Sequence, residues 1–197
     1  MCKCKIMSSC AVLLIGLFFS LDVKAQDIAV KTNLLSDATA TINLGMELGL
    51  SRKWTVDVSG NLNAWNMPSN KKWKHWMVQP EVRYWLCHRF IGDFFGFHLH
   101  GGQYKVGNLD NGIKFLGTDF SKLSYSRFQG WFVGGGLGYG HSWVINKFWS
   151  MEAEIGVGYS YTKYEKYPCA ECGDLEGKGE HHYWGITKVA LNLIYCF

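Results

Sequence analysis

A strict alternation of apolar and polar residues runs through most of the chain. Between positions 41 and 50, every second residue is apolar, namely Ile42, Leu44, Met46, Leu48 and Leu50. Polar residues and glycines fill the positions between them. A period of two places the two sets on opposite faces of a β-strand. The segment 41–50 is therefore predicted to be a strand with one apolar face.

The same period returns in later segments and predicts eight strands in all. We expect them at 28–35, 41–50, 54–64, 78–86, 95–100, 131–140, 151–161 and 186–197. Residues 51–53 separate the second and third segments and predict a hairpin turn. Pro80 lies inside a predicted strand although it has no N–H to donate, and we expect a bulge at that position.

The predicted connections alternate between short and long. Those on one side are 51–53, 87–93 and 143–147, and those on the other are 36–39, 66–75, 105–127 and 163–182. Short turns on one side, long polar loops on the other and an even strand number are typical of outer-membrane proteins. The sequence therefore predicts an all-β fold, an eight-stranded antiparallel up-and-down transmembrane β-barrel with its short turns in the periplasm.

Aromatic residues gather at the predicted strand ends. The periplasmic set is Trp54, Trp85, Trp143, Phe148, Trp149, Tyr195 and Phe197, and the outer set is Trp65, Trp73, Trp76, Trp131, Tyr161, Tyr183 and Trp184. Two such girdles are expected where amphipathic rings meet lipid headgroups, although strand ends in soluble sandwiches also carry core aromatics. The terminal Phe197 resembles the signal by which the barrel assembly machinery recognises its substrates.

The first 25 residues have the pattern of a secretory signal peptide. Lys3 and Lys5 precede an apolar run from Ala11 to Leu21, and the segment Val23-Lys24-Ala25 supplies small residues at the two positions that determine cleavage after Ala25. We predict a signal peptide at 1–25 and a barrel domain at 26–197. A membrane anchor is disfavoured because a spanning helix needs about 20 apolar residues. Lipidation at Cys10 is disfavoured because this cysteine precedes the apolar run.

Composition and motifs narrow the function classes. The chain is 48% apolar and 18% charged, which excludes a disordered protein. Its net charge of +4 is weak and scattered, so no nucleic acid partner is predicted. Nucleophile-elbow, Walker and H-E-x-x-H motifs do not occur, and the alternating glycines from Gly134 to Gly140 lack nucleotide-binding spacing. We predict no cofactor, no metal and no catalytic residue.

Charged and polar residues occupy the predicted inward positions of the strands. This set is Glu47, Asp57, Glu81, Arg83, His98, His100, Glu152, Glu154 and Lys188. Side chains fill the lumen of a narrow eight-stranded barrel, and charges buried there must pair. We therefore predict a structural network of ion pairs and hydrogen bonds. A proton or ion path, or a paired-carboxylate acid–base site, remains the alternative.

Histidine and cysteine pairs raise the question of metal binding. His98 and His100 share one strand face, but two ligands are too few for a zinc site. Cys169 and Cys172 fall in the same predicted outer loop as His181 and His182. An exported loop favours a disulfide between Cys169 and Cys172, with free thiols and a metal site as the alternatives.

The most basic predicted loop contains Lys71, Lys72, Lys74 and His75, interleaved with Trp73 and Trp76. At the outer leaflet such a loop would face lipopolysaccharide phosphates and sugars. A solvated loop without a ligand is the simpler interpretation.

Three stretches of the chain resemble a known bacterial family. They are KTNLLSDATATINLGMELGL (31–50), KKWKHWMVQPEVRYW (71–85) and HLHGGQYKVG (98–107). They resemble the domain-of-unknown-function family 3575, and the similarity covers nearly the whole mature chain. The resemblance implies an outer-membrane barrel of a Gram-negative bacterium and brings no catalytic residues with it.

These observations together predict a small, non-enzymatic outer-membrane β-barrel. Its surface loops would serve structural or binding interactions with a protein or glycan partner, and its surroundings would be outer-membrane lipid and lipopolysaccharide. A barrel enzyme acting on outer-membrane lipid and a soluble exported lipocalin-like binder are the two alternatives.

Overall fold

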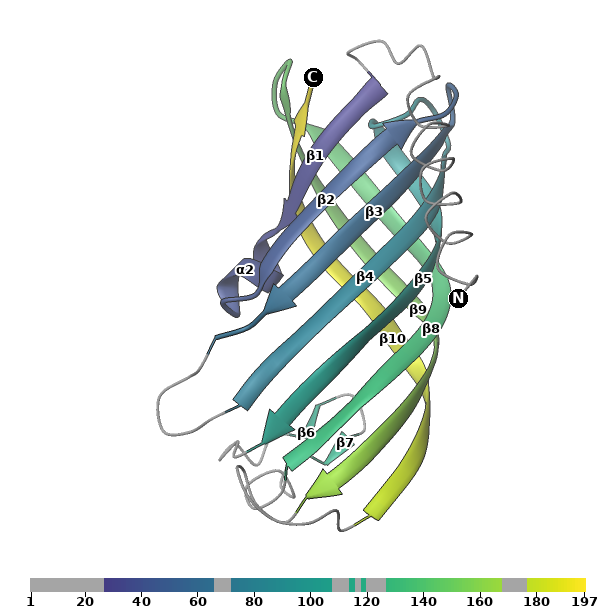
Figure 1. Ribbon diagram of the computed structural model, residues 1–197. Helices are drawn as coiled ribbons and strands as arrows, with labels where there is room; N and C mark the ends of the chain where they lie inside the picture. The colour runs from purple at the N-terminus through teal and green to yellow at the C-terminus, as the bar shows by residue number, and fades with distance from the viewer. Residues whose placement is uncertain (1–26, 66–71, 108–113, 116–117, 120–126, 168–176) are drawn as a thin grey trace, which may run out of the picture.

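Eight long antiparallel strands form one closed sheet in the computed structural model, which describes residues 27–65, 72–107, 114–115, 118–119, 127–167 and 177–197. The strands are β1 (Ile28–Asn33), β2 (Ile42–Gly49), β3 (Trp54–Asn63), β4 (Lys72–Trp85), β5 (Gly92–Gly107), β8 (Arg127–Val144), β9 (Trp149–Tyr167) and β10 (Gly177–Cys196). Each long strand pairs with the next, and β1 pairs with β10, so the sheet closes into a barrel (Figure 1). The predicted all-β fold with eight up-and-down strands is confirmed. The predicted signal peptide lies outside the described residues.

The barrel wall rises in height around its circumference. The strands lengthen from 6 residues in β1 to 20 in β10. Figure 1 shows β1 and β2 ending beside the short helix α2 (Leu34–Ala38), while β8, β9 and β10 continue to the end that carries the long loops. A short hairpin whose strands have two residues each, β6 (Lys114–Phe115) and β7 (Thr118–Asp119), lies in the connection between β5 and β8. No described helix has the length and apolar character needed to cross a membrane.

The first predicted strand ends two residues early because Asn33 caps a helix. The backbone N–H of Leu35 donates to Asn33 Oδ1 over 3.1 Å, which satisfies one free donor of the first turn of α2. The same oxygen accepts from the backbone N–H of Leu191 at 3.2 Å. Asn33 therefore joins the end of β1, the start of α2 and the edge of β10, and the predicted 36–39 connection is partly helical.

The last predicted loop, 163–182, is wrong at both ends. β9 and β10 remain paired as far as Lys166 and Gly177. Lys163 pairs with Glu180 at 3.0 Å, and Lys178 pairs with Glu165 at 2.8 Å, so cross-strand ion pairs extend the ladder. Apolar alternation does not continue there, and the pattern therefore did not indicate a strand.

The irregularity of the sheet lies in β10 and not at Pro80. The register of β4 is unchanged on both sides of Pro80, so the predicted bulge is wrong. The ladder with β5 omits Gln79 and Pro80 without an extra residue. A register shift instead occurs between Ile186 and Lys188. It reverses the side-chain faces, so Thr187 does not lie on the outer face with Val189, where strict alternation through 186–197 would place it.

The two faces of the barrel have inverted polarity compared with an ordinary soluble protein. Large apolar side chains cover the outside, with Leu137 66% exposed and Phe97 52% exposed. Among the described residues, nineteen buried residues are polar or charged and only five are hydrophobic. Soluble domains bury their apolar residues instead. The strand alternation therefore places the polar face inside the barrel and the apolar face outside.

Exposed or half-buried aromatic side chains near both ends of the strands mark two levels on the outer face. The pairs are Trp54 at the start of β3 and Trp65 two residues beyond its end, Trp131 and Trp143 on β8, Trp149 and Tyr161 on β9, and Trp184 and Tyr195 on β10. Members of a pair are eleven or twelve positions apart. At a rise of about 3.3 Å per residue and a tilt of roughly 45°, the two levels lie about 28 Å apart. Leu137 stands midway between its two aromatic residues.

Candidate functional site

The interior of the barrel is built in layers. From the short turns towards the long loops, the inward side chains of β4 are Trp85, Arg83, Glu81, Gln79, Met77 and His75. They pass through four successive layers, and His75 lines both of the last two. We call the layers the aromatic plug, the ion-pair network, the inner cavity and the outer vestibule.

The aromatic plug closes the end with the short turns. Trp85 and Phe94 are fully buried, and their ring centroids lie 4.6 Å apart. Trp85 Nε1 donates to Thr55 Oγ1 over 2.9 Å, so the indole is both packed and hydrogen-bonded. The prediction that Trp85 belongs to the periplasmic aromatic girdle is therefore wrong. Trp85 points inward because it shares its strand face with Arg83.

Arg83 is the centre of the ion-pair network and contacts five buried carboxylates. Its Nη1 lies 2.9 Å from Glu47 Oε2 and 2.9 Å from Glu152 Oε2. Nη2 lies 2.7 Å from Glu154 Oε2 and 3.6 Å from Asp57 Oδ2, and Nε lies 3.2 Å from Glu81 Oε1. The guanidinium carbon stands 4.5 Å from the centre of the Phe94 ring. A planar fork of five donors suits this arrangement, because a lysine presents a single charged nitrogen.

Two lysines complete the network. Lys188 Nζ lies 2.9 Å from Glu154 Oε2 and also contacts Glu81. Lys31 Nζ lies 2.5 Å from Glu47 Oε2 and 3.4 Å from Asp57 Oδ1. Lys31 is not among the residues predicted for the lumen, although its alternation with Val30 and Thr32 is a signal for the inward face. The network thus joins five carboxylates to three cations.

Neutral side chains donate hydrogen bonds to carboxylates at the edge of the network. Thr55 Oγ1 donates to Glu47 Oε1 over 2.5 Å, and Asn192 Nδ2 donates to Glu152 Oε1 over 2.8 Å. Buried charges are tolerated when they are paired and hydrogen-bonded in this way. The seven charged residues predicted for the lumen therefore meet in one cluster.

The two predicted histidines lie beyond that cluster. His98 and His100 are buried, with ring centroids 5.9 Å apart. Thr187 Oγ1 lies 2.9 Å from His98 Nε2, and it reaches the interior because of the register shift in β10. In the described part of the chain, no three or more His, Cys, Asp or Glu side chains are arranged so that they could hold a metal ion.

Glycines on β8 make room for the network. A Cβ at Gly138 would lie 2.7 Å from Glu154 Oε1, and one at Gly140 would lie 2.7 Å from Cε1 of the Phe94 ring. Both positions face inward, where large side chains from β5 and β9 need the space. The alternating glycines of this strand therefore have a packing role.

Gly140→Ala is expected to destabilise the barrel by about 1–3 kcal/mol, the usual cost of overpacking a filled interior. The added methyl group must displace the buried Phe94 ring. The urea midpoint of the refolded protein measures this loss. Gly60→Ala is the matched control, because the nearest atom to a Cβ there is the Leu44 carbonyl oxygen at 4.0 Å. Equal losses in both variants would show that the Phe94 contact is unimportant.

The inner cavity lies next to the ion-pair network and has a volume of about 310 Å³. Hydroxyl and amide side chains dominate its lining, including those of Thr41, Asn43, Ser59, Asn61 and Gln79. Asn43 Nδ2 donates to Asn61 Oδ1 over 2.8 Å. Gln79 is only 4% exposed, and its Nε2 has no hydrogen-bond partner among the described residues.

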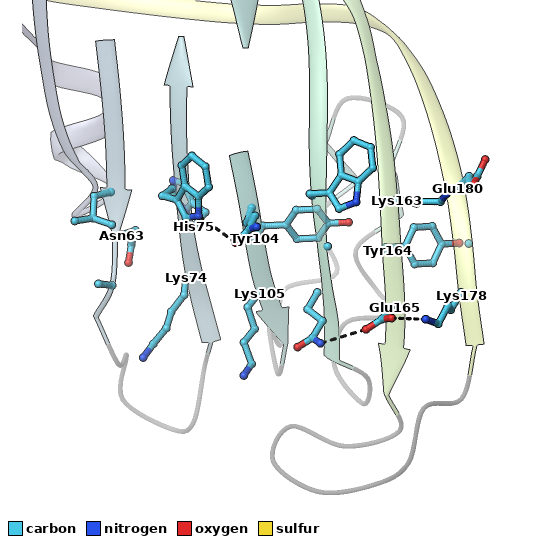
Figure 2. Close-up of a pocket in the computed structure, with 18 residues that line it drawn as sticks. Asn63, Lys74, His75, Tyr104, Lys105, Lys163, Tyr164, Glu165, Lys178 and Glu180 are labelled. Atoms are coloured by element: carbon cyan, nitrogen blue, oxygen red, sulfur yellow. Dashed lines mark hydrogen bonds and ion pairs between the residues drawn. The ribbon is translucent and has the colours of Figure 1, made fainter. Parts of the chain in front are cut away.

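The outer vestibule opens towards the long loops and has a volume of about 940 Å³. Figure 2 shows Tyr104 of β5 and Tyr164 of β9 among the side chains that line it, with His75 of β4 beside Tyr104 and Asn63 on β3. Tyr104 packs near Phe132, with ring centroids 6.3 Å apart. The vestibule therefore combines aromatic rings with polar side chains.

Charged residues surround the rim on the outer face. Lys74 and Lys105 are directly opposite each other in the β4–β5 register, and both extend towards the loop end in Figure 2. The predicted basic loop 66–75 is wrong from Lys72 onward, because β4 begins there, and residues 66–71 lie outside the described residues. Beyond the outer aromatic level, the Lys178 hydrogen bond lowers the pKa of Glu165.

The structure describes only some of the cysteines of the mature chain. Cys169 and Cys172, the predicted disulfide, lie outside the described residues. His181 and His182 are consecutive residues of β10, so they point to opposite faces and do not share one site. In the described part of the chain, the cysteines Cys87 and Cys196 are free thiols.

The fold and its interior define a class, a small closed β-barrel with an apolar exterior, a charged and plugged lumen, and a vestibule at one end. The chain belongs to the family described as "Protein of unknown function (DUF3575)", whose model matches residues 11–197. Neither a search of curated proteins nor a search of solved structures produced a match.

Proposed function

We propose that the protein is a small, non-enzymatic outer-membrane β-barrel that binds an external ligand or partner through its vestibule and loops. The observation that carries this proposal is the inverted polarity of the barrel, with a charged interior inside an apolar outer face. Two aromatic levels about 28 Å apart bound that outer face, close to the apolar band of about 25 Å in outer-membrane barrels.

Burial of the outer face in lipid accounts for its composition. Side chains such as Leu137, Phe97 and Ile155 are more than half exposed and form part of one band around the barrel. An apolar band of this kind is unfavourable in water, whereas a closed barrel satisfies its backbone hydrogen bonds inside a bilayer. The proposal therefore assigns this band to the hydrocarbon core of the outer membrane.

The loops suggest the orientation. The short turns of outer-membrane barrels face the periplasm, and their long loops face outward. The terminal Phe197 would then lie on the periplasmic side, where the barrel assembly machinery acts. Lys74 and Lys105 would lie near the outer leaflet, where lipopolysaccharide phosphates attract cations. The vestibule in this orientation opens to the exterior.

A binding role fits the interior better than transport or catalysis. The aromatic plug and the ion-pair network fill the lumen at the end with the short turns. None of the five network carboxylates lines the vestibule, and each contacts Arg83, so they are engaged in the ion-pair network and are not placed to react with a ligand that enters there. The proposed protein holds a ligand at its outer end and does not pass it through.

Membrane fractionation and conductance test this proposal. The mature chain, expressed in a Gram-negative host, is expected in the outer-membrane fraction, with migration on a gel that changes on heating. In planar bilayers the folded barrel is expected to show no steady conductance, because the plug and network block the lumen. Recovery in the soluble periplasm would favour the lipocalin-like alternative. A steady open channel would contradict the closed lumen.

A further inference from the structure

We propose that the vestibule and inner cavity bind a neutral saccharide, whose terminal ring enters the inner cavity while the following rings lie in the vestibule. This inference rests on the proposed function, since the vestibule must face the exterior for the ligand to enter. It adds a ligand class that the fold alone does not define.

The lining of the inner cavity matches a ligand rich in hydroxyl groups. Its amides and hydroxyls present both donors and acceptors, and a sugar hydroxyl also donates and accepts. The charged residues at its edge are Lys31, Asp57 and Lys188, and each contacts an opposite charge of the ion-pair network. The cavity therefore favours a neutral polar ligand over an anion or a cation.

Two buried side-chain amides, one at the inner cavity and one at the vestibule, each have an atom without a hydrogen-bond partner in the described part of the chain. Gln79 Nε2 is a donor at the inner cavity, and Asn63 Oδ1 is an acceptor at the vestibule. Neither atom has a hydrogen-bond partner among the described residues, although both side chains are more than nine-tenths buried. A buried polar group without a partner is unfavourable, and a ligand hydroxyl would satisfy each of them.

The vestibule supplies the apolar contacts that sugars use. Tyr104 and Tyr164 line it, and Phe128 packs against Tyr164 with ring centroids 5.7 Å apart. Aromatic faces pack well against the C–H face of a sugar ring, while a few polar groups fix the orientation. The volumes of about 310 and 940 Å³ both lie in the range of ligand sites. Together they extend the site beyond a single ring and favour an oligosaccharide.

An array of neutral and acidic glycans tests the proposal directly. The mature chain is refolded in lauryldimethylamine oxide, because common maltoside and glucoside detergents are themselves sugars. Its folding is checked by heat-modifiable migration before the array is probed. Glycans that bind are then titrated by calorimetry, each as the free monosaccharide and as an oligosaccharide with the same terminal unit.

Gln79→Leu separates ligand binding from folding. Removal of the unpartnered amide is expected to weaken binding of the array glycan about tenfold or more, the effect of one lost buried hydrogen bond. The urea midpoint is expected to stay the same or rise, because no internal hydrogen bond of Nε2 is lost. Val78→Leu is the matched control. It introduces the same residue type one position earlier on the outer face, and binding should not change.

The binding results distinguish the source of the saccharide and can overturn the inference. Tighter binding of the oligosaccharide supports a glycan chain as the source, and equal binding of the monosaccharide supports a free sugar. A folded barrel that binds no neutral glycan, binds only acidic glycans, or binds equally well as Gln79→Leu would overturn the inference. Fractionation is an independent readout. A chain that enters the outer membrane but binds no sugar refutes only the saccharide, and a soluble chain that binds sugar refutes only the membrane role.

Discussion

Arg83→Gln is expected to reduce the free energy of unfolding by about 3–5 kcal/mol, the usual loss when one partner of a buried ion pair is removed. Arg83 is fully buried and contacts all five carboxylates of the network. Without it, two lysines face five carboxylates inside the barrel. Glutamine retains hydrogen-bonding capacity but no charge, so the variant mainly tests charge compensation.

Urea unfolding of the refolded barrel, followed by heat-modifiable migration, measures this effect. Arg52→Gln is the matched control, because Arg52 is exposed in the turn between β2 and β3 and should change stability by less than about 0.5 kcal/mol. An Arg83→Gln barrel as stable as the control variant would show that the network does not depend on its central cation.

A compensating variant tests the reason for the loss. Glu47 and Glu152 both contact Nη1 of Arg83. Changing both to glutamine in the Arg83→Gln background leaves three carboxylates and two lysines. Part of the lost stability should return, because residues of one network are coupled and their effects are not additive. A further additive loss would instead assign Arg83 a packing role against Phe94.

Leu137→Arg is expected to destabilise the folded barrel in lipid vesicles by about 2–4 kcal/mol. Leu137 is 66% exposed and lies midway between Trp131 and Trp143 on β8. In the proposed orientation it faces the centre of the bilayer, where a cation has neither water nor a counter-ion. The same substitution on the surface of a soluble protein would have little effect.

The loss of stability should depend on how deep the new charge lies in the membrane, so an arginine near the strand end is the control. Ile145→Arg places the same charge directly after the end of β8, where Ile145 has the outward parity of Leu137 and Trp143 and is 58% exposed beside the aromatic level. Its expected cost in vesicles is at most about 1 kcal/mol, because arginine can reach the interface there. Equally small costs at the two positions would contradict burial of the outer face in a membrane.

The alternation of apolar and polar residues predicted most of the fold, because a strand has only two faces. The residues predicted for the lumen, such as Glu47, Arg83 and Glu154, all lie inside and are buried. The period of two assigned these faces without any knowledge of pairing. The same reasoning predicted eight antiparallel strands in up-and-down order, which the sheet topology confirms.

The alternation of apolar residues did not predict strand ends or side-chain orientation where another interaction determines them. The β9–β10 ladder continues through ion pairs such as Lys163–Glu180, which have no hydrophobic period. Asn33 ends β1 because its side chain caps α2. The register shift beside Thr187 turns that residue inward, towards His98. Each depends on a partner that periodicity does not identify.

The amino-acid sequence by itself determined which face of each strand is polar, and hence that charged side chains would fill a narrow lumen. Only the tertiary structure decided which of those charges meet. Closure of the sheet brings Arg83 of β4 to Glu152 and Glu154 of β9, on strands that are not neighbours in the sheet. Those contacts depend on the barrel's diameter and on the stagger of its strands, which arise only when β1 pairs with β10.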